Sequence, residues 1–323
     1  MRDISYAEAI NEALKEEMER DEKVILLGED IGIFGGVFKV TRGLLERFGP
    51  KRVRDTPISE GAIIGAAIGA ATTGLRPVAE IMYMDFLNVA GDQLVNHAPK
   101  IHFMSGGKLN VPMVIRTQFS LGRSIAGQHS QFFPAFFMNL PGMYVAVPST
   151  PYDAKGLLKT AIRSNNPTLF LESAVLYSAK GQVPEEEYVV PLGKADIKKK
   201  GDDVTVFAFS NLVSKALVAA DELEKVGIGA EVIDPRTLAP LDRTTILESV
   251  KRTGRLVVVE PDCKTSGIGA EVITMVLEEA FDYLDAPPVR VAALDTPCPF
   301  APVLEGLYIP NEESIIQAVR KIV

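Results

Sequence analysis

The chain has 323 residues, 47% of them hydrophobic and 24% charged, with a formal net charge of −8. This composition excludes general disorder, and the length allows two domains that each bury a core. Charges of both signs are spread along the chain without a basic stripe, which excludes nucleic acid as the main partner because phosphates need clustered cations. Only Cys263 and Cys298 are present, without a Cys-x-x-Cys motif, so neither a disulfide framework nor a cysteine zinc site is expected.

The N-terminal region lacks the signals of export. Met1 to Glu19 mixes charged and isolated apolar residues and has no continuous apolar core of the kind found in signal peptides. The longest apolar stretch, Ala62 to Ala71, is about half as long as a membrane-spanning helix requires. We therefore expect a cytoplasmic protein without membrane association, in which this stretch forms a buried helix.

The first half of the chain alternates between two kinds of pattern. Ser5 followed by Glu8 is a capping box, which predicts a helix that ends near Arg20. Short apolar runs typical of buried strands then alternate with helical spacing. We expect strands at Val24 to Leu27, Val78 to Met82, Val111 to Arg116, Tyr144 to Val147 and Thr168 to Leu171, and helices at Phe86 to Lys100 and Pro151 to Arg163. This alternation predicts a parallel α/β sheet.

A less regular segment separates this half from the rest. Residues 180–203 carry prolines and two charge runs without sustained periodicity, so we expect a first domain at 1–180, a linker at 181–203 and a second domain at 204–323. Strand and helix patterns then follow in turn, at Val204 to Phe209, Leu212 to Val226, Ala230 to Ile233, Arg243 to Lys251, Leu256 to Glu260 and Ala270 to Phe281. They predict a smaller second α/β domain.

The stretch DTPISEGAIIGAAIGAATTG combines a carboxylate with a helix that has small side chains. Gly61, Gly65 and Gly69 stand four residues apart, so one helix face has almost no side chains. Each such glycine costs about 1 kcal/mol relative to alanine, which predicts close approach of another backbone, with a subunit interface as one candidate. Glu60 stands where the chain enters this helix, and the pattern fits both simple helix capping and a ligand-binding role.

Several longer strings point to one family. LLGEDIGIFGGVF, RVRDTPISE, GLRPVAEIMYMDF, DQLVNHAPK, AGQHSQ, PSTPYDAKGLL and RTLAPLD occur in order along essentially the whole chain. Together they resemble the β subunits of pyruvate, branched-chain 2-oxo acid and acetoin dehydrogenases, and EIMYMDF is most similar to the acetoin and general bacterial members. The resemblance implies a transketolase-like fold, with a pyrimidine-binding first domain and a smaller C-terminal α/β domain, and thiamine diphosphate as cofactor.

The resemblance also implies roles for three residues. Glu60 matches the glutamate that hydrogen-bonds N1′ of the aminopyrimidine, where a proton favours the tautomer that deprotonates C2 of a cofactor serving as electron sink. Phe86 matches the aromatic residue that stacks on the aminopyrimidine, although its pattern alone also fits a core aromatic. His129 matches the histidine at the mouth of the thiamine site, where an imidazole can bind a carboxylate or shuttle protons. His97 and His102 match no catalytic position.

RSNNP resembles a loop that holds a structural potassium ion in some members. The implied ligands are carbonyls near Met113, Ala161 and Ile162, together with Asn166. Ser164 stands where the human-type sequences have aspartate. Because a hard cation prefers oxygen ligands, loss of that carboxylate should weaken the site.

The partners follow from a missing motif. Single-chain thiamine enzymes hold magnesium and the diphosphate with a Gly-Asp-Gly motif, which this chain lacks. The resemblance therefore implies an α subunit that supplies magnesium and the diphosphate ligands in an α2β2 heterotetramer, and a lipoyl acyltransferase core that receives the acyl group. An acetoin dehydrogenase β subunit is the nearest alternative. A non-catalytic scaffold would not need Glu60, Phe86 and His129 together, and a self-sufficient transketolase-like enzyme would need Gly-Asp-Gly.

Overall fold

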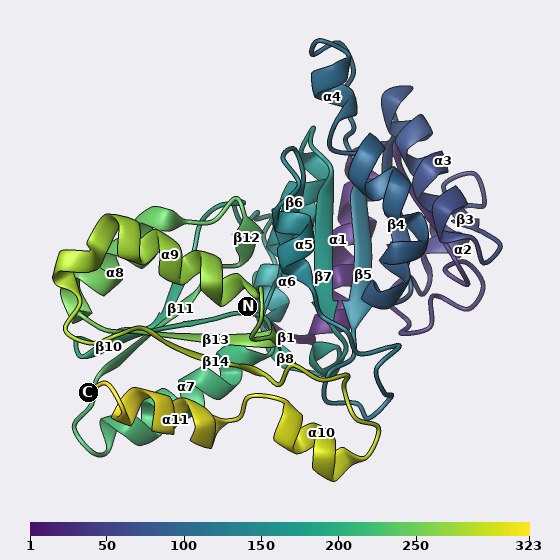
Figure 1. The fold of residues 1–323 in the computed structure, drawn as a ribbon. Coiled ribbons are helices and arrows are strands. Elements are labelled where there is room, and N and C mark those ends of the chain that lie inside the picture. The colour runs from purple at the N-terminus through teal and green to yellow at the C-terminus, as the bar shows by residue number, and fades with distance from the viewer. The chain divides into compact units, whose positions relative to one another are not determined.

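The computed structural model describes residues 1–323, which form two compact units. Unit 1 comprises Met1–Phe119 and Phe137–Leu192, and unit 2 comprises Ser120–Phe136 and Gly193–Val323. Each unit combines helices with a mainly parallel sheet (Figure 1), as the sequence predicts. The segment Ser120–Phe136 lies inside the first half of the sequence but belongs to unit 2.

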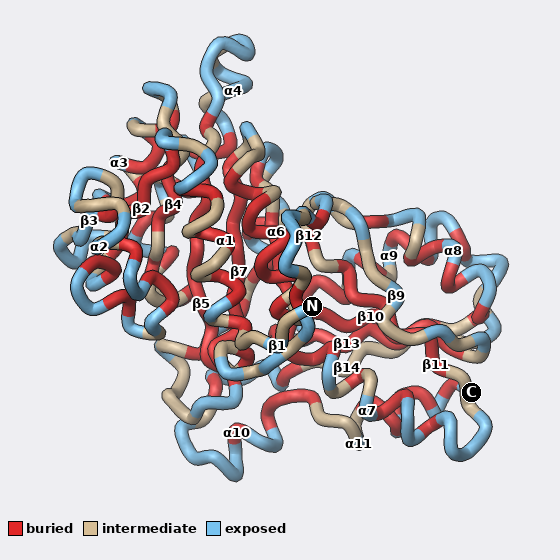
Figure 2. Tube along the Cα trace, turned by 180° about the vertical axis from the view of Figure 1, so that it is seen from behind, coloured by how far each residue is buried: buried red, intermediate tan, exposed pale blue.

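The sheet of unit 1 has parallel strands in the order β6-β7-β5-β4-β2-β3. Its strands are β2 (Val24–Gly28), β3 (Val53–Asp55), β4 (Arg76–Ile81), β5 (Val114–Phe119), β6 (Tyr144–Ala146) and β7 (Thr168–Ser173). Its central strands are largely buried (Figure 2), which explains their continuous apolar runs. β5 begins three residues later than predicted, because Pro112 has no N–H group to donate to a neighbouring strand.

Two helices of unit 1 pack against each other and against this sheet. α1 (Tyr6–Arg20) begins with the predicted capping box, and α6 (Pro151–Arg163) has the predicted bounds. Their apolar faces share a core with the strands, in which Ile10, Leu14 and Leu157 are fully buried.

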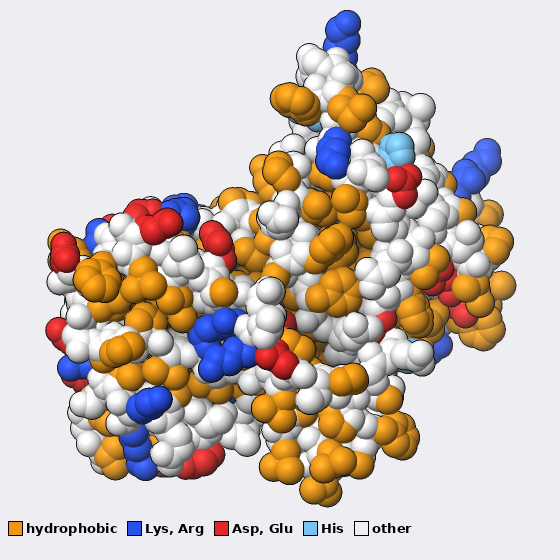
Figure 3. All heavy atoms as spheres, in the orientation of Figure 1, with side chains coloured by type: hydrophobic (Ala, Val, Ile, Leu, Met, Phe, Trp, Pro, Cys, Tyr) orange, Lys and Arg blue, Asp and Glu red, His pale blue; other side chains and the backbone are white.

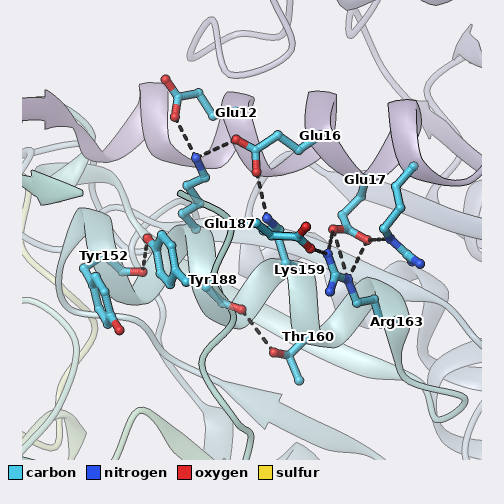
Figure 4. A network of polar contacts seen from close by, with 12 residues as sticks. Glu12, Glu16, Glu17, Tyr152, Lys159, Thr160, Arg163, Glu187 and Tyr188 are labelled. Atoms are coloured by element: carbon cyan, nitrogen blue, oxygen red, sulfur yellow. Dashed lines mark hydrogen bonds and ion pairs between the residues drawn. The ribbon is translucent and has the colours of Figure 1, made fainter. Parts of the chain in front are cut away.

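A ladder of ion pairs joins the polar faces of α1 and α6 (Figure 4). Lys155 Nζ lies 2.6 Å from a carboxylate oxygen of Glu16 and 2.9 Å from one of Glu12. Lys159 Nζ lies 2.7 Å from the other Glu16 oxygen. Both lysines are only 1% exposed, and an ammonium group buried to this degree requires such partners.

Two predictions for unit 1 need correction. The helix predicted at Phe86 to Lys100 is wrong as a single element. The segment instead forms a 3₁₀ helix η1 (Met84–Ala90), a π-helical turn η2 (Gln93–His97) and the short α4 (Ile101–Met104). Gly91 and Pro99 interrupt it because both residues disfavour a helix interior. The apolar helix α3 (Glu60–Thr72) is buried on one face only, since Ala62 and Ala66 are exposed.

Unit 2 has a sheet in the order β14-β13-β10-β11-β9, in which only β9 is antiparallel to its neighbour. The six elements predicted for this region are all present. The strands are β9 (Asp196–Lys199), β10 (Val204–Ala208), β11 (Ala230–Asp234), β13 (Leu256–Cys263) and β14 (Val289–Ala293), and the helices are α7 (Leu212–Glu224), α8 (Arg243–Thr253), α9 (Ile268–Ala280), α10 (Pro302–Tyr308) and α11 (Glu312–Arg320).

The remaining elements are short. They are β1 (Arg2–Ser5), which pairs with β8 (Lys180–Val183), and α2 (Leu44–Phe48), α5 (Pro134–Met138), β12 (Thr237–Ala239), η3 (Ala174–Leu176) and η4 (Phe281–Tyr283). β8 and β9 lie within or at the edge of the predicted linker at 181–203, so that segment contains regular structure. No helix of the chain combines the length and the apolar character needed to cross a membrane.

Candidate active site

Glu60 is the first residue of α3, which follows the short strand β3. The carboxylate is half-buried and makes no hydrogen bond or ion pair within the chain, and Ser59 at the N-cap position makes no side-chain capping bond. Glu60 therefore makes no capping hydrogen bond, although its place in the first turn suits the helix dipole. Burial, followed by the charges of Glu60 and Asp30, raises the pKa of the Glu29 carboxyl above its ordinary value.

Phe86 lies on η1, which packs against α3. An added Cβ on Gly61 would lie 3.7 Å from the Val89 carbonyl oxygen, and one on Gly65 would lie 3.8 Å from Gln93. These distances are ordinary van der Waals contacts, and Gly69 faces open space, so within the chain no backbone approaches this helix face closely enough to require glycine. Since α3 carries Glu60 and η1 carries Phe86, the packing of these elements places both predicted cofactor residues in one region of unit 1.

A chain of aromatic rings connects Phe86 to the interior. The rings of Phe86 and Tyr83 meet edge to face at 5.5 Å, and those of Tyr83 and Phe38 do so at 6.1 Å. Phe38, from the glycine-rich loop after β2, stacks on Tyr177 at 5.2 Å. Such contacts restrict ring orientation and contribute about 0.5–1.5 kcal/mol each beyond area burial. No local sequence pattern predicts that Tyr83, Phe38 and Tyr177 continue from Phe86 as a chain of rings.

The aromatic chain ends at a buried ionic cluster of four residues. Arg116 donates two hydrogen bonds to Glu172, at 2.7 and 2.8 Å, and a third to Glu80 at 2.6 Å. Tyr177 donates from its hydroxyl to Glu172 at 2.7 Å. Burial raises the pKa of Glu172 despite the guanidinium charge. These residues come from separate strands and a later turn, so no local sequence pattern reveals that they meet.

His129 lies in the loop between β5 and α5, which belongs to unit 2, whereas Glu60 and Phe86 belong to unit 1. It is half-buried, and its backbone N–H donates to the Ala126 carbonyl at 3.3 Å. The other two histidines are exposed and have local partners. His97 lies 3.1 Å from an Asp92 carboxylate oxygen, and a ring nitrogen of His102 lies 2.9 Å from the Leu109 carbonyl.

The loop predicted to hold potassium already has hydrogen bonds to its carbonyls. Arg76 donates to the carbonyls of Ile162 and Ser164 at 3.0 and 2.9 Å. The other predicted ligands also have partners. The Met113 carbonyl accepts from the Thr168 N–H, and the Ala161 carbonyl accepts from the Ser164 N–H. The Asn166 side-chain amide donates to the Tyr144 hydroxyl. Each carbonyl oxygen keeps a second lone pair for a cation. Among the predicted ligands, a potassium ion would share the Ile162 carbonyl oxygen with the positively charged Arg76.

Comparisons with known proteins show which family the chain resembles over its whole length. Residues 2–179 match the transketolase pyrimidine binding domain and residues 193–315 match the transketolase C-terminal domain. The chain is 48% identical to the pyruvate dehydrogenase E1 β subunit of Rickettsia bellii, over 99% of this chain and 98% of that protein. It is 46% identical to two Bacillus subtilis proteins. These are the β subunit of acetoin:2,6-dichlorophenolindophenol oxidoreductase (98% of this chain, 96% of the relative) and that of 2-oxoisovalerate dehydrogenase (99% and 98%).

A solved structure gives the same result. A split-gene transketolase, described as an inactive β4 tetramer, superposes with a TM-score of 0.82 at 26% identity, over 99% of this chain and 98% of the other. The chain belongs to the transketolase-like family of dehydrogenase E1 β subunits.

Proposed function

We propose that this chain is the β subunit of a thiamine-diphosphate-dependent 2-oxo acid dehydrogenase, which decarboxylates a 2-oxo acid such as pyruvate and acylates lipoamide. The observation that carries the proposal is the carboxylate of Glu60, which is half-buried and unpartnered on the helix that packs against the element of Phe86. Because no group of this chain bonds the Glu60 carboxylate, it is available to accept a hydrogen bond from a ligand.

The residues of unit 1 fit the pyrimidine end of the cofactor. When bound, thiamine diphosphate supplies an electron sink for the bond-breaking step. Glu60 would accept the hydrogen bond from protonated N1′ and hold the proton there. Phe86, oriented by Tyr83, would offer an apolar face to the ring and exclude water from it.

We assign the substrate side to His129. An imidazole can accept or release a proton near neutral pH, and in its protonated form it attracts a substrate carboxylate. Its loop is rich in Gly, Ser and Gln, and the residue is half-buried, both of which favour this role over that of a core histidine.

Completion of the site would come from an α subunit that brings magnesium and the diphosphate ligands, in an α2β2 heterotetramer bound to a lipoyl acyltransferase core. Exposed apolar side chains support an assembled state. In unit 1, Ile58 is 82% and Val89 64% exposed beside the exposed alanines of α3. In unit 2, hydrophobic residues gather over α10 (Figure 3), where Val303 and Leu307 are more than 70% exposed. Apolar patches of this kind mark protein interfaces. The related β4 tetramer is described as inactive, which fits a need for a second type of subunit.

Acetoin cleavage is the second candidate reaction, because the chain is as similar to an acetoin oxidoreductase β subunit as to a 2-oxoisovalerate dehydrogenase β subunit. A reconstituted complex of this chain and its α subunit would be assayed with pyruvate, branched-chain 2-oxo acids and acetoin. We expect dye reduction with a 2-oxo acid that depends on thiamine diphosphate. Activity with acetoin alone would select the second candidate, and no activity with any of them would refute both.

We keep potassium at the loop of Met113, Ala161, Ile162 and Asn166 as a prediction with its own test. If the ion binds there, the chain should melt at a higher temperature in KCl than in NaCl at equal ionic strength, because a ligand bound only by the folded state stabilises it. Arg76→Gln should enlarge the difference by removing the competing charge. Equal melting temperatures in the two salts, for both proteins, would exclude the site.

A further inference from the structure

Glu305 is a buried carboxylate whose hydrogen-bond partners lie in the loop that leads to His129. It lies on α10 and is 3% exposed. The backbone N–H groups of Gly122 and Ser124 each donate to it at 2.8 Å, and the Ser124 hydroxyl also donates at 2.8 Å. The Cys298 thiol lies 3.6 Å from the same carboxylate. All of these residues belong to unit 2.

The three short hydrogen bonds bind a carboxylate that has no cationic partner. Glu305 forms no ion pair, and its negative charge is compensated by two amides and two side-chain donors. Hydrogen bonds to an ionised carboxylate are roughly twice as strong as those between neutral groups. The carboxylate therefore fixes the path of the backbone at Gly122 and Ser124 more firmly than a neutral side chain could.

The loop needs such a restraint. Ser124 and Ala126 have φ angles of +55° and +66°, in the left-handed region that residues other than glycine rarely adopt. Gly127 lies beside Pro297, since an added Cβ would be 3.5 Å from that residue, an ordinary van der Waals distance. The backbone N–H of His129 in turn donates to Ala126, so the strained turn positions the histidine directly.

We propose that Glu305 is a positioning residue for His129, acting through the restrained turn at Ser124 and Ala126. The proposal rests on the role assigned to His129 above. Glu305 itself touches neither substrate nor cofactor. It holds the loop in the conformation that presents the imidazole.

Glu305→Gln tests the proposal in the complex reconstituted with the α subunit. The glutamine has nearly the same shape as the glutamate but no negative charge. Its amide NH2 is a donor, so it cannot accept a hydrogen bond from one of the loop donors. We expect lipoamide-dependent turnover to fall about 10- to 100-fold, which corresponds to the loss of a hydrogen bond to a charged group. Amide hydrogen exchange should become faster in residues 120–130. Glu278→Gln, an exposed glutamate on α9 without a hydrogen bond, is the matched control and should change neither readout.

A double-mutant cycle separates positioning from simple stabilisation of the fold. If Glu305 acts through His129, the variant that carries both Glu305→Gln and His129→Ala should be no slower than His129→Ala alone, because the coupled effects are not additive. If the turnover of the double variant instead falls by the product of the two single losses, the proposal is overturned. Unchanged hydrogen exchange in the loop of Glu305→Gln would also overturn it.

Two further readouts keep the result interpretable. If Glu305→Gln fails to fold, Ser124→Ala removes one of the three short bonds from the loop side and should give a smaller loss of turnover with the same non-additivity. Normal turnover of His129→Ala would refute the assigned role of His129, and with it the positioning role. The hydrogen exchange of Glu305→Gln would then still show whether the carboxylate holds the loop, so the two failures are distinguishable.

Discussion

Glu60→Gln should reduce the turnover of the reconstituted enzyme by about 10²- to 10⁴-fold, the usual contribution of a positioned acid or base. The amide keeps the shape of the side chain but cannot share a proton with N1′ of the cofactor. Because Glu60 makes no bond within the chain, the substitution should leave the melting temperature of the protein almost unchanged. Steady-state assays and thermal unfolding of the same preparation measure both effects.

Glu46→Gln is the matched control for this substitution. Glu46 is exposed on α2 and makes no hydrogen bond, so the same chemical change there should affect neither turnover nor stability. Near-normal activity of Glu60→Gln would remove Glu60 from the mechanism. A large loss of stability would instead show that its carboxylate has a structural role.

His129→Ala should separate two steps of the reaction. Thiamine diphosphate should still bind, and deuterium exchange at its C2 position should proceed at nearly the normal rate, because that step needs the aminopyrimidine and Glu60. Overall lipoamide-dependent turnover should fall by about 10²-fold or more, in the range of general acid–base contributions. Both assays require the α subunit.

The comparison between the two rates decides the role of His129. Exchange that falls in step with turnover would mean that the histidine organises the cofactor, contrary to the division of labour proposed here. His102→Ala serves as the control, since that histidine is exposed on α4 and its imidazole bonds only the nearby Leu109 carbonyl. It should leave exchange and turnover unchanged.

Elements with strong local signals could be predicted from the sequence. α6 has the predicted bounds because Thr150 caps its first turn and Pro151 follows at a position that tolerates proline. The segment after Phe86 was predicted wrongly because its apolar spacing is helical, while Gly91 and Pro99 break the regular hydrogen bonding. β14 was missed because most of its residues are only half-buried and show no clear alternation.

Some residues of the candidate site could also be predicted from the sequence, and others could not. Glu60, Phe86 and His129 could be selected because the strings around them resemble a known family. Arg116, Glu172 and Glu305 could not, because their partners lie far away in the sequence and meet only in the folded chain. A buried ionic group carries no local pattern when its neighbours come from other strands and loops.

Binding of thiamine diphosphate to this chain, to the α subunit and to their mixture tests the central claim most directly. Calorimetric titration in the presence of magnesium would measure all three. We expect tight binding only by the mixture, because unit 1 offers groups for the pyrimidine end whereas the diphosphate ligands come from the partner. Glu60→Gln in the mixture should weaken that binding. Tight binding by this chain alone, or a mixture that fails to bind, would contradict a site shared between two subunits.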